Sequence, residues 1–196
     1  MNRRLCLKAM AAGMTAAAEV ASGATPVVAG PAPKPLPAGA ITSPPRSLAV
    51  LDFELVDDQN NPLTKPAQEI RLRNATQQLQ QELTERQLYR VVDPAPSQDL
   101  QRALRNQQEF LYRCDDCADQ IGKRLGVDLV MATWVQKVSE LILNLNVQIY
   151  DVKAQKVVLS KSVDMRGNDD VSWTRAVRYL VRDMAEKRER NPRYGL

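Results

Sequence analysis

Hydrophobic and polar positions alternate most regularly in the second half of the chain, where they predict three consecutive β-strands. Residues 141–151 alternate over their whole length, with one set of side chains apolar and the other polar. Because successive side chains of a strand point to opposite faces, this segment predicts a strand with one buried and one wetter face. Residues 128–138 and 156–165 flank it and complete an antiparallel meander. The apolar set consists of Leu141, Leu143, Leu145, Val147 and Ile149.

The first half of the chain alternates between strands and helices. Residues 47–55 form a largely apolar run typical of a central strand, and residues 89–92 form a short second strand. A helix is expected between them, because apolar residues recur there every three or four positions. The order β-α-β predicts a parallel pair of strands with a right-handed crossover. The apolar positions of this helix are Leu72, Ala75, Leu79 and Leu83.

Three further helices complete the predicted order. One begins at Ser97, whose hydroxyl suits an N-cap, and a second covers residues 115–125 and stops at Gly126. The strongest helical pattern covers residues 171–188, with one apolar stripe of Trp173, Ala176, Val177, Leu180, Val181 and Met184. The order β-α-β-α-α-β-β-β-α predicts an α/β (α+β mixed) fold, in which helices pack on a five-stranded mixed sheet.

The N-terminal residues lack this pattern and are expected to lie outside the domain. Arg3, Arg4 and Lys8 precede a weakly apolar stretch that ends in small residues near Ala24, which is the pattern of a cleaved export signal. A twin-arginine signal and a general secretion signal both fit. The expected organisation is a signal peptide over residues 1–24, a proline- and alanine-rich linker over 25–46, one domain over 47–190 and a tail over 191–196.

Composition and charge exclude several classes of function. The 196 residues include no histidine, which excludes histidine-based triads, histidine metal ligands and c-type haem attachment. The formal net charge is +4, and removal of residues 1–24 takes away three basic residues and one acidic residue, which leaves +2. So small an excess does not favour a nucleic-acid-binding protein. The apolar stretch before Ala24 is too short and too weakly apolar for a membrane span. We expect no bound cofactor.

Cys114 and Cys117 form the one motif that could take part in redox chemistry or metal binding. If Cys6 is removed with the signal, they are the only thiols of the exported chain, and the periplasm is oxidising. One interpretation is a structural disulfide at the start of the following helix. A redox-active pair is the second, although the two intervening aspartates oppose a thiolate. Half of a metal site, completed by nearby aspartates, is the third.

Two polar clusters are candidates for a partner-binding surface. One lies on the strand expected over residues 128–138, and the other precedes and begins the last helix. They consist of Trp134, Gln136 and Lys137, and of Arg166, Asn168 and Trp173. Asp169 or Asp170 is expected to cap the last helix. The acidic residues Asp52, Glu54, Asp57 and Asp58 are interpreted as ending the first strand and solvating its loop, because acid–base catalysis would require a pocket.

Several of these segments resemble known families. The opening run from Leu48 to Phe53 and the passage from Ile121 to Asp128 resemble the amino-terminal domain of TolB and the periplasmic domain of CsgG. A closer resemblance, to a family of uncharacterised bacterial secreted proteins, rests on three segments: Cys114-x-x-Cys117, the run from Trp134 to Asn146, and Arg166-Gly167-Asn168 followed by Ser172-Trp173. At Asp169 the chain departs from the threonine expected there. The resemblance implies a TolB-like fold, export and a non-enzymatic role.

Two functions from different classes remain. The first, which the sequence favours, is a non-catalytic periplasmic accessory or interaction module. Its partner would be a periplasmic or envelope protein, bound through a sheet edge or through the region of Trp134 and Arg166. The alternative is a thiol–disulfide or metal-handling protein centred on Cys114 and Cys117.

Overall fold

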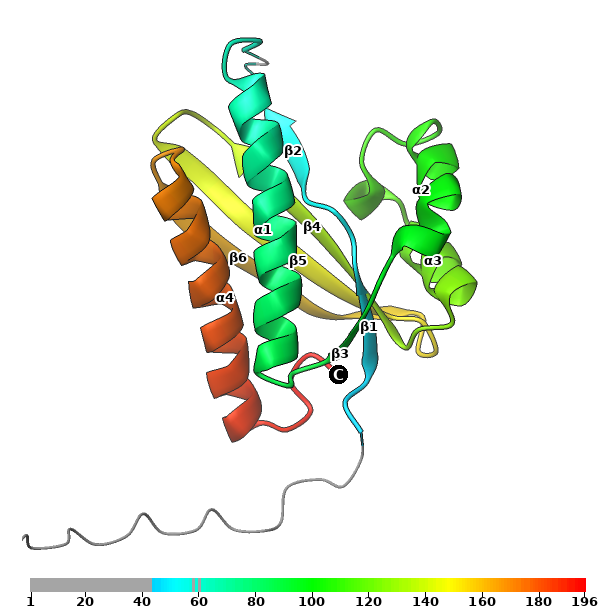
Figure 1. Cartoon of the computed structure of the whole chain (residues 1–196). Coiled ribbons are helices and arrows are strands. Elements are labelled where there is room, and N and C mark those ends of the chain that lie inside the picture. Colours follow the sequence, from blue (N-terminus) through cyan, green and yellow to red (C-terminus); the bar gives the residue numbers. More distant parts are fainter. Residues whose placement is uncertain (1–43, 58, 60) are drawn as a thin grey trace, which may run out of the picture. The chain divides into compact units, whose positions relative to one another are not determined.

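Six β-strands pair into one mixed sheet, and α-helices pack against both of its faces (Figure 1). The computed structural model describes residues 44–57, 59 and 61–196. The signal peptide expected over residues 1–24 and most of the linker expected over residues 25–46 lie outside the described residues. The mixed α/β architecture and the packing of helices on a sheet agree with the prediction from the sequence.

The elements follow one another in the predicted order, apart from one additional strand. The strands are β1 (Ser47–Val50), β2 (Glu54–Asp57), β3 (Arg90–Val92), β4 (Leu129–Lys137), β5 (Ile142–Asp151) and β6 (Lys156–Arg166). The helices are α1 (Lys65–Glu85), α2 (Gln98–Arg105), α3 (Cys117–Leu125) and α4 (Asp170–Arg190). The sheet order is β3-β1-β4-β5-β6, and β2 also pairs with β4. The parallel pair β1–β3 and the antiparallel meander β4–β5–β6 are both confirmed.

The strand expected over residues 47–55 is interrupted, which is why the sheet has six strands rather than the predicted five. Leu48 lies opposite Leu129 of β4, whereas Glu54 lies opposite Trp134. Six steps along the first strand therefore match five steps along β4. One extra residue has to be accommodated, so the ladder breaks between β1 and β2 in the manner of a β-bulge.

Two threonine side chains satisfy the backbone at this break. Thr133 Oγ1 donates to the carbonyl oxygen of Leu51 at 2.9 Å. The N–H of Phe53 donates to Thr76 Oγ1 of α1 at 3.1 Å. Both contacts are buried, where an unpaired backbone group would be costly. The break is thus a fixed feature that also ties α1 to the sheet.

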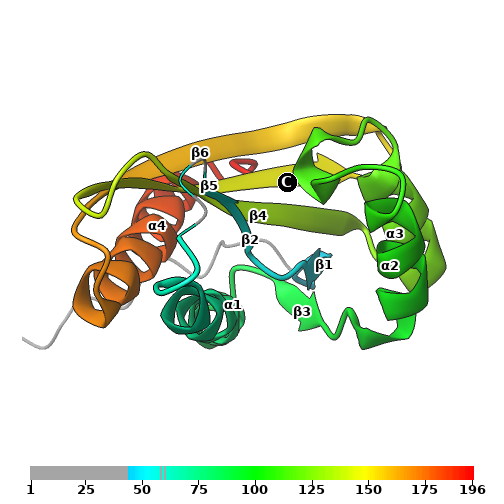
Figure 2. The same ribbon diagram turned by 90° about the horizontal axis from the view of Figure 1, so that it is seen from above.

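The larger core lies between the sheet and two helices. Figure 2 shows α1 and α4 side by side on one face of β4, β5 and β6. Ten predicted core side chains of β5 and α4 are buried there: Leu143, Leu145, Val147, Ile149, Trp173, Ala176, Val177, Leu180, Val181 and Met184. Leu141 was predicted on the same face, but it is 72% exposed. It precedes the first residue of β5 and lies in the turn that joins β5 to β4.

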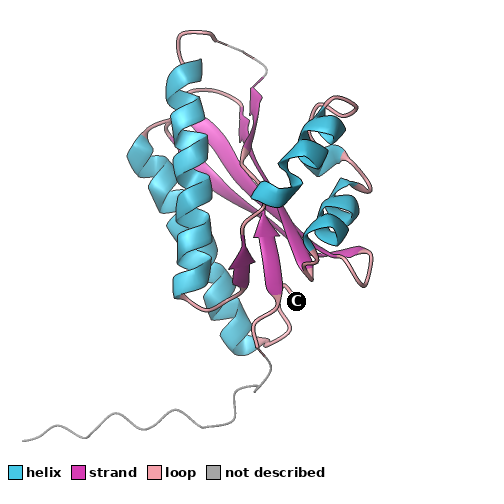
Figure 3. Ribbon diagram, turned by 45° about the vertical axis from the view of Figure 1, so that its right-hand side comes forward, coloured by secondary structure: helices cyan, strands magenta, loops and turns pink. Residues whose placement is uncertain are grey.

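A smaller core lies on the opposite face. There α2 and α3 cover β1 and the beginning of β4 (Figure 3), and Ile121 and Val130 are fully buried between them. Beyond this cover, the face carries the half-exposed side chains of Asn144, Asn146 and Gln148. The predicted division of β5 into a buried and a wetter face is therefore confirmed.

Two of the predicted helix ends are confirmed and one is wrong in its detail. Gly126 ends α3 with a left-handed backbone, φ 64°. Asp169 caps α4 by accepting the N–H of Ser172 at 2.9 Å. Ser97 occupies the N-cap position of α2, but its hydroxyl accepts from Gln101 Nε2 at 2.9 Å and bonds no helical N–H.

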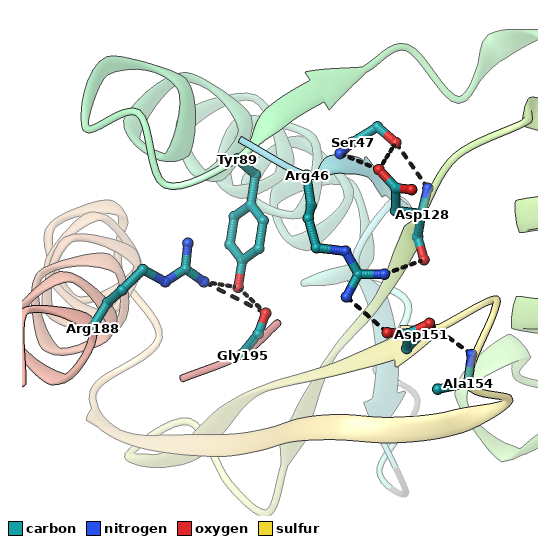
Figure 4. Close-up of polar contacts among 8 residues, drawn as sticks. All are labelled: Arg46, Ser47, Tyr89, Asp128, Asp151, Ala154, Arg188 and Gly195. Atoms are coloured by element: carbon teal, nitrogen blue, oxygen red, sulfur yellow. Dashed lines mark hydrogen bonds and ion pairs between the residues drawn. The ribbon is translucent and has the colours of Figure 1, made fainter. Parts of the chain in front are cut away.

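Polar contacts fix the start of the domain to the beginning of β4 and the end of β5 (Figure 4). Ser47 donates to the Asp128 carboxylate through Oγ at 2.6 Å and through N–H at 2.8 Å. These bonds hold the pKa of Asp128 below its usual value of 3.8. Arg46 Nη1 lies 2.7 Å from Asp151 Oδ2, and this hydrogen bond likewise lowers the pKa of Asp151. Arg46 therefore fixes the first residues of the domain to the end of β5.

The last six residues also belong to the fold, where the sequence predicted a separate tail. The phenolic O–H of Tyr89 donates to the carbonyl oxygen of Gly195 at 2.7 Å (Figure 4). Arg188 Nη2 donates to the same phenolic oxygen at 2.5 Å and to the carbonyl of Tyr194 at 2.9 Å. Tyr194 and Leu196 pack against the larger core. The end of α4 is thus held against Leu88 and Tyr89, the two residues that precede β3.

Leu180→Ala is expected to lower the free energy of unfolding by about 2–5 kcal/mol, because it leaves a cavity at a fully buried position in α4. Leu141→Ala removes the same atoms from an exposed side chain and should change stability by less than about 0.5 kcal/mol. Urea unfolding of both variants measures the difference. A loss below about 0.5 kcal/mol for Leu180→Ala would show that α4 does not pack on the sheet.

Asp128→Asn is expected to lower stability well above pH 3.8, with a deficit that shrinks in acid. The lowered pKa means that the carboxylate stabilises the fold above 3.8 and that this contribution is lost as the pH falls through the folded-state pKa. Urea midpoints measured over a pH series test this, with the exposed Asp115→Asn as the control. A deficit that is constant with pH would contradict the assigned role.

Candidate functional site

A disulfide joins Cys114 to Cys117 at the entrance to α3, with 5.5 Å between the two Cα atoms. Cys117 is the first residue of the helix and is fully buried in the smaller core, whereas Cys114 is half-buried. The bond therefore fixes the connection between the 3-10 turn Leu111–Arg113 and α3.

The surroundings of the disulfide do not favour a reactive thiol. The Sγ of Cys114 lies 3.4 Å from Oδ1 of Asp116, and a carboxylate at this distance opposes formation of a thiolate. Cys114, Asp116 and Cys117 hold potential metal-ligand atoms within 4.8 Å of one another. In the disulfide neither sulfur is a thiolate, so this group becomes a set of metal ligands only after reduction.

Trp134 lies beside the disulfide loop on the less covered face of the sheet. Its ring stacks on that of Tyr112, with 4.2 Å between centroids and 6° between planes. The guanidinium of Arg113 lies 5.4 Å from the Tyr112 ring. Glu54 of β2 holds this loop by accepting the N–H of Leu111 at 3.0 Å. Trp134 is consequently half-covered, and an aromatic and cationic rim borders it.

Lys137 is buried, so its predicted role in a partner-binding surface is wrong. Its side chain is inaccessible to solvent, and Nζ lies 3.0 Å from Asp57 Oδ2 and 2.6 Å from Glu140 Oε1. Burial lowers the pKa of Lys137, but the hydrogen bonds to the two carboxylates outweigh it and raise the pKa above 10.5. Asp57, which the sequence placed in a solvated loop, is thus the buried partner of Lys137.

Trp173 is only 3% exposed, and it too is excluded from a partner surface. Its indole Nε1 donates to Asn168 Oδ1 at 2.9 Å, and Asn168 Nδ2 donates to Glu140 Oε2 at 2.8 Å. Since Glu140 also binds Lys137, the two predicted clusters form one hydrogen-bonded chain that ties the β4–β5 turn to α4. Lys137, Asn168 and Trp173 stabilise the fold, whereas Gln136 and Arg166 remain exposed.

A groove of about 550 Å³ lies between β6 and the first half of α4. It is lined by Ser162, Val163, Asp164, Met165, Arg166, Ser172, Arg175, Ala176 and Tyr179. Among the described strands, β6 forms the edge of the sheet and pairs with β5 alone, above α4 in Figure 2. Arg166 was predicted as a site residue, but Arg175 and Tyr179 were not. Their signal in the sequence is weak, because both lie off the apolar stripe of the last helix.

Comparison with known proteins identifies a family. A family model, DUF3280, described as "Protein of unknown function (DUF2380)", matches residues 46–184. No curated protein matches the chain. The predicted resemblance to an uncharacterised family is confirmed in this form, whereas the resemblance to CsgG stays a prediction.

Several solved structures are similar at low sequence identity. LpoB from E. coli is 13% identical, over 85% of this chain and 96% of that chain, with a TM-score of 0.45. The hypothetical protein CT253 from Chlamydia trachomatis is 12% identical, over 74% and 99%, with a TM-score of 0.48. TolB from Acinetobacter baumannii is 9% identical, over 76% and 29%, with a TM-score of 0.41. Similarity at this level carries no functional argument.

The disulfide is expected to be structural. In the exported chain it should resist the glutathione pool, with a potential below about −300 mV. Replacing both cysteines by serine should lower the melting temperature modestly, because the closed loop is short and its stabilisation lies at the low end of about 2–4 kcal/mol. Redox titration and an insulin-reduction assay on the same sample provide the test. A potential near about −200 mV together with turnover would identify a thiol oxidoreductase instead.

Proposed function

The chain belongs to the DUF3280 family of proteins of unknown function, and we propose that it is a non-catalytic accessory module of the bacterial envelope that binds another protein. The observation that carries the proposal is the free edge of β6 beside the groove along α4. An unpaired strand edge offers backbone N–H and C=O groups to an added strand, and a neighbouring groove provides room for its side chains.

The polar side chains inside the domain support a non-catalytic role. The side chains of Lys137 and Asn168 form ion pairs and hydrogen bonds that join β2, the β4–β5 turn and α4. Asp128 and Asp151 owe their lowered pKa values to bonds with Ser47 and Arg46 that hold the start of the domain. Perturbed pKa values also mark catalytic sites, but here each has a structural cause.

The location that fits this role is the periplasm. An export signal is predicted over residues 1–24, with cleavage near Ala24. The Cys114–Cys117 disulfide suits an oxidising compartment. Among the residues that the structure describes, no helix combines the length and the apolarity that crossing a bilayer requires. The partner would then be a periplasmic or envelope protein.

Site-specific photo-crosslinking in the native bacterium tests the proposal. A photoreactive side chain at Ser162 of β6 is expected to capture an envelope protein, whereas one at the exposed Arg124 of α3 is not. Fractionation of the same cells should place the chain, without residues 1–24, in the periplasm. A cytoplasmic chain that retains residues 1–24, or equal capture from both positions, would contradict the proposed function.

A further inference from the structure

The register of β6 shows which of its backbone groups point away from the sheet. The N–H of Gly167 donates to the carbonyl oxygen of Leu141 at 3.1 Å, which marks a hydrogen-bonded pair next to the Arg166–Ile142 position. Hydrogen-bonded and non-hydrogen-bonded pairs alternate along an antiparallel ladder. Ser162, Asp164 and Arg166 are therefore the residues whose N–H and C=O face the open edge.

Ser172 at the start of α4 supports this register. Its hydroxyl donates to the carbonyl oxygen of Arg166 at 3.0 Å, as expected if that carbonyl points away from β5. The remaining outward groups are the N–H and C=O of Ser162 and Asp164 and the N–H of Arg166. They form a short, regular ladder of donors and acceptors that have no hydrogen-bond partner among the residues the structure describes.

The usual protection of a strand edge lies in the first part of β6, up to Lys161. Proteins protect edges with inward-facing lysines, prolines and bulges. Lys161 pairs with Asp183 of α4, and the one irregularity of the β5–β6 ladder lies at Ile149/Tyr150, near the start of β6. Residues 162–166 carry no proline and no bulge. This half of the edge is regular and open to pairing.

The groove determines what an added strand would meet. In β6 the side chains of Val163 and Met165 face α4 and are buried. Alternate side chains of a strand paired beside them would point the same way. They would enter the groove against Ala176, Tyr179 and Arg175 of α4. The pocket for these side chains is thus partly apolar and partly cationic.

The charges of the groove favour an acidic occupant. Arg166 and Arg175 are both exposed, and neither forms an ion pair within the described part of the chain. The one carboxylate of the lining, Asp164, accepts a hydrogen bond from Asn144 on the face away from α4. A carboxylate that enters on the α4 side therefore meets the guanidinium of Arg175 without a competing anion in the lining.

From these observations, and resting on the function proposed above, we propose that an extended, acidic segment of the partner protein adds to the sheet as a seventh strand. It pairs with residues 162–166 of β6 and places a carboxylate beside Arg175. A second copy of this chain is a poorer occupant. Two β6 edges paired antiparallel about residue 164 would set Asp164 directly opposite its counterpart, which is destabilising.

Binding of model peptides to the full chain tests the chemistry. A capped ten-residue peptide that alternates valine and glutamate should bind, more weakly at high salt, whereas one that alternates valine and lysine should not. Arg175→Glu should lower the affinity for the acidic peptide at least about tenfold and allow the basic peptide to bind. Arg178→Glu makes the same charge change on α4 at a position that lines the groove between α1 and α4, and it should leave binding unchanged. Fluorescence anisotropy measures all four combinations.

Proline substitutions test the backbone pairing. Asp164→Pro removes an outward N–H and should abolish peptide binding with little change in melting temperature, because edge strands tolerate proline where the N–H faces solvent. Val163→Pro removes an N–H bonded to β5 and should destabilise the fold. Equal affinity for the two peptides, or undiminished binding by Asp164→Pro, would overturn the proposal. A reversible dimer that Asp164→Pro abolishes would overturn it in favour of a second copy.

The same variants separate this inference from the proposed function. If Arg175→Glu and Asp164→Pro still capture the envelope partner in cells, the interaction role stands and the strand-addition mode is wrong. If the wild-type chain binds the acidic peptide but captures no partner in cells, the preference of the groove for an acidic strand is supported and the proposed function is wrong.

Discussion

The whole structure depends on the pairing of β4 along both of its edges. A buried strand must satisfy every backbone N–H and C=O, and β4 is buried over most of its nine residues. β5 satisfies one edge over the full length. The other edge needs both β1 and β2, because β1 has only four residues and the chain between them carries one residue too many. The hydroxyls of Thr133 and Thr76 make this arrangement possible.

The two ends of the sheet differ in how far they are covered by other elements. At the end next to β1, the short β3 and the helices α2 and α3 cover the strands, and the disulfide fixes the approach to α3. At the other end, the eleven-residue β6 has α4 on one face, and no other described strand pairs with its outer edge. Within the described part of the chain, the backbone ladder without a partner strand is therefore found at β6, where hydrogen bonds through Glu140 and Asn168 hold the neighbouring turn in place.

The sequence predicts those features that depend on local burial. The alternation in β5 and the apolar stripe of α4 each indicate which face of that element is buried. Each pattern lies within one continuous segment of the sequence. The break between β1 and β2 depends on the register against β4, about 80 residues away, so the apolar run at residues 47–55 contains no trace of it. The burial of Lys137 could not be predicted for the same reason, because its partner Asp57 comes from a different strand. Arg175 and Tyr179 become candidates only once β6 is known to be an edge.

Amide hydrogen exchange of the full chain, followed residue by residue by NMR, tests the central claim most directly. Without peptide, the amides of Ser162 and Asp164 are expected to exchange quickly and those of Val163 and Met165 slowly, because only the latter donate to β5. Addition of the valine–glutamate peptide should slow Ser162 and Asp164 and leave Arg124 of α3 unchanged. Slow exchange of Ser162 and Asp164 in the free chain, or no slowing on addition of the peptide, would contradict the assignment of β6 as the binding edge.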